Sequence, residues 1–376
     1  MSAIARSTQT VRPLVQGARA YRRHLDQYGT GGRSSVNDIT VAIFGATGFL
    51  GRYVTNSLGR TGTRCFIPNR GDEMDHRHIK TQFDLGQVYF PYYSSTDEHS
   101  IRAAIGDADV VVNMIGKYNE TKHLVYTRRE DGALSRVNCS YQQANVDIAE
   151  RLARIAKEQG ASRFIQVSAL AADPGSESAW ARTKAEGEVA VRTVFPEATI
   201  VRPAKMFGHE DRFLTWTAIM AAKLGRVPLV NNGDSLLQPV DVRDVSKVMM
   251  TLIDDPENVD YRGKTVEIAG HLEYSWSEVV DFVLDATQRV DSTRVHRLSN
   301  WEAELVGTIL EQFPNPYWTK DEAIQMRSDV LVSPDTDALT IADFGIEPAK
   351  MEEATLALLR SYRRVSHFGV VKGYHL

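Results

Sequence analysis

The 376-residue sequence lacks several features that define whole classes of protein. No run comes near the roughly 18 consecutive apolar residues that a membrane-spanning helix needs. Only two cysteines occur, Cys65 and Cys139, which excludes a disulfide scaffold and a four-cysteine zinc site. We expect both thiols to be buried as small apolar side chains. With 43% hydrophobic and 24% charged residues, the chain can build a core, so disorder is excluded for most of its length.

Lysine and acidic residues are absent from the first 25 positions, which contain five arginines (Arg6, Arg12, Arg19, Arg22 and Arg23). A basic, acid-free leader without the apolar segment of a secretory signal is typical of a mitochondrial transit peptide. A disordered basic tail is the alternative. Residues 28–35 are rich in Gly and Ser and are typical of a flexible linker. We therefore predict a transit peptide and linker over residues 1–35.

The charge of the remaining chain argues against two kinds of partner. Beyond the leader there are 39 Lys and Arg against 48 Asp and Glu, a net charge of −9. No long basic cluster is present to follow phosphates, so we expect no nucleic-acid binding. His76, His78 and His99 do not combine with acids at metal-ligand spacing, so we expect surface histidines and no metal site.

Apolar strands and helical segments alternate from residue 39 onwards. Strands are predicted at 39–44, 64–68, 88–90, 108–115, 163–168 and 198–201, and helices at 49–58, 100–105, 145–159 and 184–194. This alternation predicts an α/β fold with a Rossmann-type, doubly wound parallel sheet over residues 36–210. Beyond residue 210 the alternation loosens, with helices at 213–224 and 244–253. We predict a smaller C-terminal α/β lobe over 211–376 that shares some sheet segments with the Rossmann domain.

Three glycines, Gly45, Gly48 and Gly51, follow a predicted strand and open a predicted helix. In this context the first permits a tight turn, the second lets backbone N–H groups approach a pyrophosphate, and the third lets the helix pack closely. The helix N-terminus would face the phosphates with unpaired N–H groups. A glycine-rich turn without a ligand is the alternative. The predicted cofactor-binding residues of this segment are Gly45, Thr47, Gly48, Phe49, Leu50, Gly51 and Arg52.

The end of the second predicted strand indicates which dinucleotide binds. A carboxylate there would accept hydrogen bonds from the ribose hydroxyls of NAD, but the sequence reads Pro68-Asn69-Arg70. The planar donor fork of Arg70 suits a 2′-phosphate, and Arg52 could reach the same group. We therefore predict NADPH as the cofactor. A solvated surface arginine is the alternative for Arg70.

Six segments carry a family resemblance. They are residues 41–52, 110–116, 144–146, 164–168, 201–208 and 238–245. Together and in this order they resemble the extended or atypical short-chain dehydrogenase/reductases. The resemblance implies that Ile115, Gly116, Pro203 and Met206 lie beside the dinucleotide.

A narrower resemblance rests on residues 44–54, 84–87, 115–117, 120–122 and 207–214. These runs are most similar to the nucleotide-binding accessory subunits of mitochondrial respiratory complex I (NADH:ubiquinone oxidoreductase), over about residues 36–350. The resemblance implies a subunit on the matrix side of the inner membrane that holds NADPH and is needed for assembly or stability. Its implied partners are other complex I subunits at the junction of the peripheral and membrane arms, near the quinone region.

The proton relay of the superfamily is incomplete in this sequence. Its chemistry needs a Tyr four residues before a Lys, with a Ser nearby. Lys184 and Ser168 are present, but Trp180 stands at the tyrosine position, and an indole N–H has no useful acid–base chemistry near neutral pH. We therefore predict no catalytic residue, and a cofactor-positioning role for Ser168 and Lys184. Trp180 either covers the nicotinamide end or packs in the core.

The leading hypothesis is a non-catalytic, NADPH-binding accessory subunit. The alternatives are a free-standing NADP-dependent reductase or epimerase of the mitochondrial matrix, and a redox sensor of the NADPH/NADP ratio. Residues 351–368 contain Leu356, Leu358 and Leu359 with three arginines. This segment is predicted to contact a membrane surface or a partner, or to dock on its own lobe.

Overall fold

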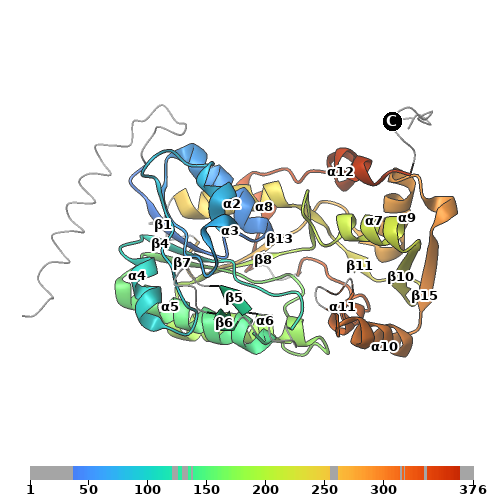
Figure 1. The fold of residues 1–376 in the computed structure, drawn as a ribbon, viewed down its shortest axis with the longest axis horizontal. Helices are drawn as coiled ribbons and strands as arrows, with labels where there is room; N and C mark the ends of the chain where they lie inside the picture. Colours follow the sequence, from blue (N-terminus) through green and yellow to red (C-terminus); the bar gives the residue numbers. More distant parts are fainter. Residues whose placement is uncertain are drawn as a thin grey trace, which may run out of the picture.

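A computed structural model describes residues 37–120, 139–254, 261–313, 316, 318–333 and 337–364, with the backbone of two short strands at 126–128 and 134–136. A parallel sheet of eight strands forms the centre of the larger lobe (Figure 1). In order across the sheet the strands are β16 (Leu339–Thr340), β13 (Thr265–Ile268), β8 (Thr199–Pro203), β7 (Arg163–Val167), β4 (Val110–Asn113), β1 (Thr40–Phe44), β2 (Arg64–Phe66) and β3 (Val88–Tyr89). The α/β class with a Rossmann-type parallel sheet is thereby confirmed.

Helices cover both faces of this sheet, as Figure 1 shows. One face carries α2 (Phe49–Thr61), α3 (Glu73–Lys80) and α8 (Val242–Asp254). The other carries α4 (Glu98–Ile105), α5 (Ile148–Gln159) and α6 (Ala179–Val194). The central strands are buried on both faces, so they are mainly apolar without an alternating pattern, and their polar residues Asn113, Arg163 and Gln166 are buried as well. A strand sequence such as Val110-Val111-Val112 is stable there because both of its faces contact helices.

The smaller lobe is built mainly from residues after 213. Its helices are α7 (Leu214–Lys223), α9 (Trp276–Ala286), α10 (Asn300–Leu310), α11 (Lys320–Gln325) and α12 (Met351–Leu359). Two of its strands, β10 (Arg226–Val230) and β15 (Arg294–Leu298), pair in parallel, and β11 (Leu236–Leu237) pairs with β14 (Tyr274–Ser275). Two apolar clusters hold the lobe together, one around Trp276 and one around Trp318.

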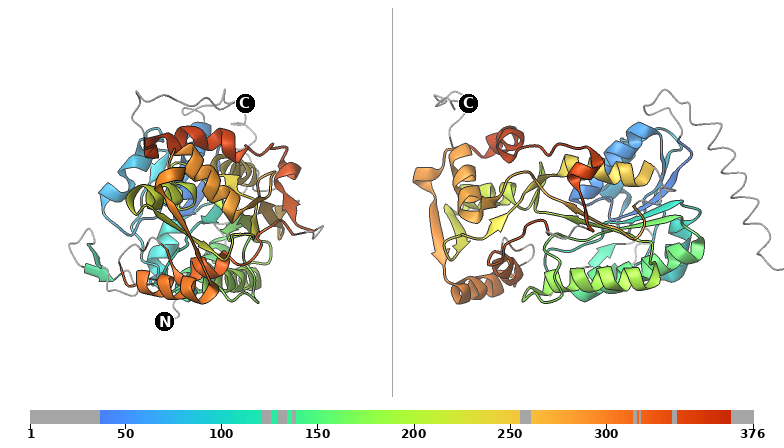
Figure 2. Two further views of the ribbon diagram at one scale, coloured as in Figure 1. Left: turned by 90° about the vertical axis from the view of Figure 1, so that its right-hand side faces the viewer. Right: turned by 180° about the vertical axis from the view of Figure 1, so that it is seen from behind.

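The chain crosses between the two lobes more than once. After the Rossmann core it enters the smaller lobe at α7, returns for α8 and β13, and comes back again for β16. Figure 1 and the right-hand view of Figure 2 show the two lobes side by side, with β15 and α10 in the lobe away from α4. None of the described helices is both long enough and apolar enough to cross a bilayer.

Several local expectations are corrected. Helix α6 begins at Ala179, five residues before the expected start, because Ser178 caps its first turn by accepting from Ala181 N–H. Cys65 is buried as expected, whereas Cys139 is only half-buried. His76 is not a surface residue: it is buried, stacks on Phe90 and contacts the Asn69 amide.

The C-terminal leucines belong to the lobe's own core. Leu358 and Leu359 are buried in the cluster around Trp276, and Leu356 packs partly against it. Of the alternatives for residues 351–368, docking on the own lobe is what the structure shows for 351–364. Residues 365–368 and the predicted leader and linker at 1–35 lie outside the described residues.

Candidate functional site

The turn between β1 and α2 can be built only with glycine at two positions. Gly45 has φ +86°, and a Cβ there would lie 2.8 Å from the carbonyl carbon of Met114. A Cβ on Gly51 would lie 2.5 Å from the Ala46 carbonyl oxygen. The first glycine therefore permits the left-handed turn, and the second lets α2 pack against it.

Helix α2 begins at this turn without a side-chain cap. Its N-cap is Gly48, and no side chain accepts a hydrogen bond from the first turn. The N–H groups at the start of a helix lack intrahelical partners, so here they remain available to an anion. This arrangement fits a dinucleotide pyrophosphate.

Two cavities meet at the turn, which contributes Gly45 and Gly48 to both, together with Gly116. The larger one, of about 820 Å³, lies at the ends of β1 and β2. Four of the predicted residues line it alone: Thr47, Arg52, Arg70 and Ile115. Cys139 also lines it, which accounts for the partial exposure of that thiol.

The two arginines of this larger cavity differ in their surroundings. The guanidinium of Arg52 donates to Glu210 Oε1 at 2.9 Å and to the Thr47 carbonyl at 3.2 Å. Arg70 is exposed at the cavity wall, and no ion pair is described for it. Of the two, Arg70 is therefore more readily available to a 2′-phosphate.

The smaller cavity, of about 240 Å³, extends from the turn toward the C-terminal lobe, and its wall is mainly apolar. The remaining predicted residues line it: Phe49, Leu50, Gly51, Ser168, Lys184, Pro203 and Met206. All of the predicted site residues are thus brought to one of the two adjoining cavities. A dinucleotide would place its phosphates at the turn, between a polar and an apolar compartment.

Ser168 and Lys184 show that the smaller cavity is suited to a polar group of a ligand. The Ser168 hydroxyl is buried and has no hydrogen-bond partner in the part of the chain that the structure describes. Burial lowers the pKa of Lys184 to about 8, although the nearby Glu188 carboxylate acts in the opposite direction. A buried hydroxyl and a buried ammonium are costly unless a ligand pairs with them, so both residues fit a bound nucleotide ribose or amide.

Trp180 is part of this cavity wall. Its indole N–H donates to the Lys117 carbonyl at 2.8 Å, and the Lys184 ammonium lies 6.0 Å from the centre of its ring. The indole is thereby fixed in the wall of the cavity. Its N–H is already used by the backbone.

An acidic residue of the C-terminal lobe fixes the start of α6 and thus Trp180. Asp321 is buried, accepts from Ala179 N–H at 2.9 Å and Trp180 N–H at 3.2 Å, and accepts from the Ser178 hydroxyl at 2.7 Å. A carboxylate at a helix N-terminus is favourable because it satisfies unpaired N–H groups and the positive end of the dipole. Sequence reasoning missed Asp321 because it lies about 140 positions from the helix that it caps.

Three further residues of the smaller cavity were also missed. Tyr118, Lys205 and Arg212 line it, with the Arg212 guanidinium 5.1 Å from the Tyr118 ring centre and the Lys205 ammonium 5.3 Å from that of Trp276. Lys205 and Arg212 fall within or beside runs that carry the family resemblance, so those runs were the available signal. Tyr118 directly follows the run 115–117, so the same signal was available for it.

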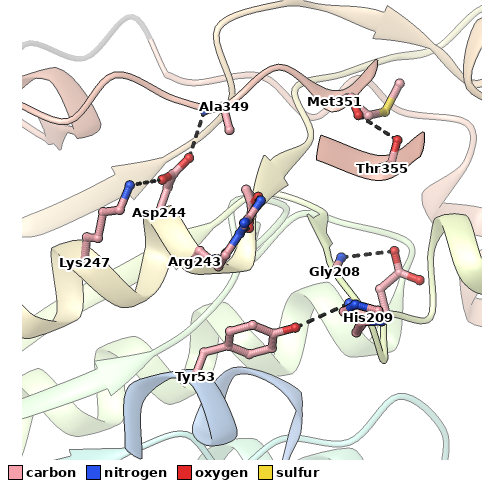
Figure 3. A network of polar contacts seen from close by, with 11 residues as sticks. Tyr53, Gly208, His209, Arg243, Asp244, Lys247, Ala349, Met351 and Thr355 are labelled. Carbon is pink, nitrogen blue, oxygen red and sulfur yellow. Dashed lines mark hydrogen bonds and ion pairs between the residues drawn. The ribbon is translucent and has the colours of Figure 1, made fainter. Parts of the chain in front are cut away.

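Helix α2 contacts the loop around His209, which leads into the smaller lobe (Figure 3). The His209 N–H donates to the Tyr53 hydroxyl at 3.4 Å, and Arg52 pairs with Glu210. Behind this junction, buried Asp244 of α8 accepts from Lys247 Nζ at 2.7 Å and from Ala349 N–H at 2.9 Å. Helix α2, which follows the glycine turn, thus contacts the loop between the lobes, and α8 contacts the segment before α12.

Among the described residues, no group of three or more His, Cys, Asp or Glu side chains is arranged to hold a metal ion.

Comparisons with known proteins agree with this geometry. A sequence model of the NAD dependent epimerase/dehydratase family matches residues 41–269. The chain is 38% identical to the mitochondrial NADH dehydrogenase (ubiquinone) 1 alpha subcomplex subunit 9 of Mus musculus, over 89% of this chain and 84% of the mouse protein. The Arabidopsis thaliana protein of the same name is 36% identical, over 91% of this chain and 82% of the plant protein.

Among solved structures, the chain resembles the dTDP-glucose 4,6-dehydratase DesIV of Streptomyces venezuelae, solved with NAD bound. The TM-score is 0.61 with 16% identity, over 86% of this chain and 97% of the dehydratase. At this identity the likeness concerns the fold alone.

Proposed function

We propose a function from one premise: the chain belongs to the NAD dependent epimerase/dehydratase family, among the subunits of mitochondrial complex I related to it. The proposal is a non-catalytic, NADPH-binding accessory subunit of mitochondrial complex I. It would act on the matrix side of the inner membrane, at the junction of the peripheral and membrane arms near the quinone region. Its partners would be other subunits of the complex, and its role would be assembly or stability of the peripheral arm.

Nucleotide binding is supported by groups for which the described residues provide no partner. These are the uncapped N-terminus of α2 and the buried Ser168 hydroxyl. NADPH is favoured over NADH because Arg70 lies on the cavity wall just after β2, whereas Asp75, the carboxylate of this wall nearest to it in sequence, follows five residues later on α3. An NAD site would need an acceptor for the ribose hydroxyls at this place.

The non-catalytic role is supported mainly by the hydrogen bond that the Trp180 indole N–H donates to the backbone. The nucleotide turn and Lys184 are retained, but the proton donor's position holds an indole whose N–H is bound to the Lys117 carbonyl. When bound, the nucleotide could supply a hydride, but this position offers no proton donor to complete a reduction. The site is therefore equipped to bind a nucleotide without consuming it.

A structural role for the nucleotide follows from the junction around α2. Phosphates at the N-terminus of α2 would stabilise the helix whose residues Arg52 and Tyr53 contact Glu210 and His209 of the interlobe loop. Binding to the folded state alone stabilises it. NADPH would thus preserve the relative placement of the lobes on which neighbouring subunits assemble.

Identification of the nucleotide released from the purified, denatured protein tests this proposal. NADPH at about one molecule per chain is the expected result, with the protein migrating in a native mitochondrial extract as part of a very large membrane complex. Absence of nucleotide, or migration at the 42.0 kDa of the chain or a small multiple, would contradict it.

The alternative of a free-standing reductase or epimerase retains one supporting observation. Tyr118 lines the same cavity as Ser168 and Lys184, so one tyrosine is present at the site from a different segment. If it donated a proton, the protein would oxidise NADPH with a carbonyl substrate, and Tyr118→Phe would abolish the activity. We expect neither the wild-type chain nor Tyr118→Phe to oxidise NADPH with a carbonyl substrate.

A further inference from the structure

The part of the smaller cavity toward the C-terminal lobe carries two cations that the proposed nucleotide site does not use. Ser168 and Lys184 suit a ribose or amide of the nucleotide, whereas Lys205 and Arg212 have no role in that site. Lys205 lies between β8 and β9 (Met206–Phe207), and Arg212 lies two residues before α7. We name this part of the cavity the basic pocket, with a wall that includes Lys205, Arg212, Phe213, Trp276 and Glu322.

The charged residues that line the whole smaller cavity are mostly basic. One of them, Glu322, is acidic, and the four basic ones are Lys117, Lys184, Lys205 and Arg212. This excess is local, because the chain beyond its leader has a net charge of −9. Charges attract one another more strongly where a low-dielectric wall replaces water, so a cavity with this balance favours an anionic ligand.

The cations of the basic pocket contact aromatic rings, and no ion pair joins either of them to an acid in the described part of the chain. The Arg212 guanidinium lies 5.1 Å and 4.5 Å from the ring centres of Tyr118 and Trp216. Its Nη2 donates to the Pro316 carbonyl at 3.1 Å, whereas its Nε is buried without a partner among these residues. The rings hold the guanidinium in place, so a donor is positioned before any ligand arrives.

The one acid of the basic pocket does not balance both cations. Glu322 Oε2 accepts from Thr319 N–H at 3.1 Å in the capping box of α11. Burial raises the pKa of Glu322, although the charges of Lys205 and Arg212 favour its ionised form. Burial likewise lowers the pKa of Lys205. The pocket is therefore poorly hydrated, and one further anion would balance its two cations against its one acid.

The size and the wall of the cavity restrict the ligand to a small planar acid. The cavity has about 240 Å³, which is below the roughly 300–1,000 Å³ of sites for drug-sized ligands. The rings of Phe213 and Trp276 on the wall favour a planar apolar body. The planar donor fork of Arg212 matches the two oxygens of a carboxylate, and Lys205 adds a point charge.

We propose that the basic pocket binds a small aromatic carboxylate, with the carboxylate at Lys205 and Arg212 and the ring against Phe213 and Trp276. The acid would lie beside the nicotinamide end of a bound nucleotide. Pairing with the two cations would offset the cost of their burial. The proposal does not depend on nucleotide binding, so it can fail or succeed separately from the function proposed above.

A matched pair of ligands tests the proposal on the full chain without nucleotide. Para-trifluoromethylbenzoate and para-trifluoromethylbenzamide have nearly the same shape and differ in charge, and their fluorine NMR signals report weak binding. We expect the benzoate to bind about tenfold more tightly than the benzamide, because its contacts with the pocket are charge-assisted. This comparison needs no variant, so it does not depend on how a substitution affects folding.

Variants then locate the bound acid. Lys205→Met and Arg212→Gln should each remove most of the preference for the benzoate and leave the affinity for the benzamide unchanged, which also reports an intact pocket. Lys205→Arg keeps the charge and should keep the preference. Lys223→Met, at an exposed lysine of α7 outside the cavity, is the matched control and should behave like the wild-type chain. Benzoate binding should persist when NADPH is added.

Three results would overturn the proposal. One is an equal affinity of the wild-type chain for the benzoate and the benzamide. Another is a preference for the benzoate that survives in both Lys205→Met and Arg212→Gln, which would assign the acid to another basic segment, such as the arginine-rich leader. The third is displacement of the benzoate by NADPH, which would place the acid in the nucleotide site.

Discussion

At the scale of single residues, Lys184 is the most informative titratable group of the site. Its folded-state pKa of about 8 lies below the value of about 10.4 for an unperturbed lysine, chiefly because the ammonium is buried. Between these two values the unfolded chain binds more protons than the folded chain, so this residue's contribution to stability rises with pH across that window. Below pH 8 the burial of the charge costs up to about 3 kcal/mol.

Lys184→Met should therefore be more stable than the wild-type chain at pH 7, by up to about 3 kcal/mol. The difference should shrink as the pH rises from about 8 and vanish near 10.5. Urea unfolding of both chains without nucleotide, at a series of pH values, measures it. A difference that does not change with pH would show that the buried ammonium is not its cause.

Arg70 determines cofactor choice in this account. Arg70→Glu should weaken NADPH binding by about 1.5–3 kcal/mol through the lost charge-assisted contact, and repulsion from the 2′-phosphate adds to this. NADH, which lacks that phosphate, should lose little. Calorimetric titration with both nucleotides measures the effect. Arg77→Glu, an exposed arginine of α3 outside the cavity, is the control, and an equal loss in it would remove Arg70 from the site.

Some residues of the site could be predicted from their neighbours in the sequence, and others could not. The glycine turn, Ser168 and Lys184 could be predicted because their roles are set by neighbours in sequence, a strand end or a helix start. Asp321 could not be predicted, because it caps α6 from about 140 positions away in the sequence. The pairing of Arg52 with Glu210 was likewise invisible, since it depends on the placement of a loop 158 positions away.

At the scale of secondary structure elements, α6 depends on a capping residue from the other lobe. In the wild-type chain the two Asp321 oxygens accept from Ala179 and Trp180 N–H. Asp321→Asn turns one of these oxygens into an NH₂ group, which cannot accept a hydrogen bond. We expect a loss of about 2–3 kcal/mol in the free energy of unfolding, because these bonds are buried and charge-assisted. Denaturant unfolding measures it.

The matched control is Asp97→Asn, at the exposed N-cap of α4, where the carboxylate accepts from His99 and Ser100 N–H. Asparagine caps helices about as well as aspartate at such a position, so the change should be within a few tenths of a kcal/mol. Equal losses in the two variants would mean that Asp321 acts as an ordinary cap and does not join the lobes.

The elements of the Rossmann core were predicted better than those of the smaller lobe. Core strands are mainly apolar, and the helices between them have clear apolar spacing. In the smaller lobe, α9, α10 and α11 were not predicted, although each begins with a capping box: Ser275 with Glu278, Ser299 with Glu302, and Thr319 with Glu322. Those pairs, three residues apart, were the local signal available in the sequence.

At the scale of the whole molecule, two short strands, β13 and β16, return from the C-terminal part to complete the sheet. Strands of four and two residues give no reliable periodicity, so sequence alone could anticipate shared segments but not locate them. Their return means that the lobes cannot separate without disrupting the sheet edge. A ligand that stabilises the Rossmann core therefore stabilises the attachment of the smaller lobe.

Gly48→Glu tests this coupling. The carboxylate would occupy the phosphate position at the N-terminus of α2, so NADPH binding should be lost. A ligand at a thousandfold excess over its Kd stabilises the folded state by about 4 kcal/mol, and the variant should lose this gain. We expect less assembled complex I, or a fragile one, by native electrophoresis of mitochondria. Normal yield and stability of a complex without nucleotide would contradict a structural role for NADPH.

The most direct test of a bound but unconsumed NADPH is its redox state in purified complex I during turnover. The fluorescence and extracted amount of the bound nucleotide are followed while NADH is oxidised and quinone is reduced. The account predicts about one NADPH per chain, still reduced after many turnovers, because Trp180 supplies no proton to a substrate that would accept the hydride of the nucleotide. Oxidation of the bound nucleotide in step with quinone reduction, or the absence of NADPH from the intact complex, would contradict it.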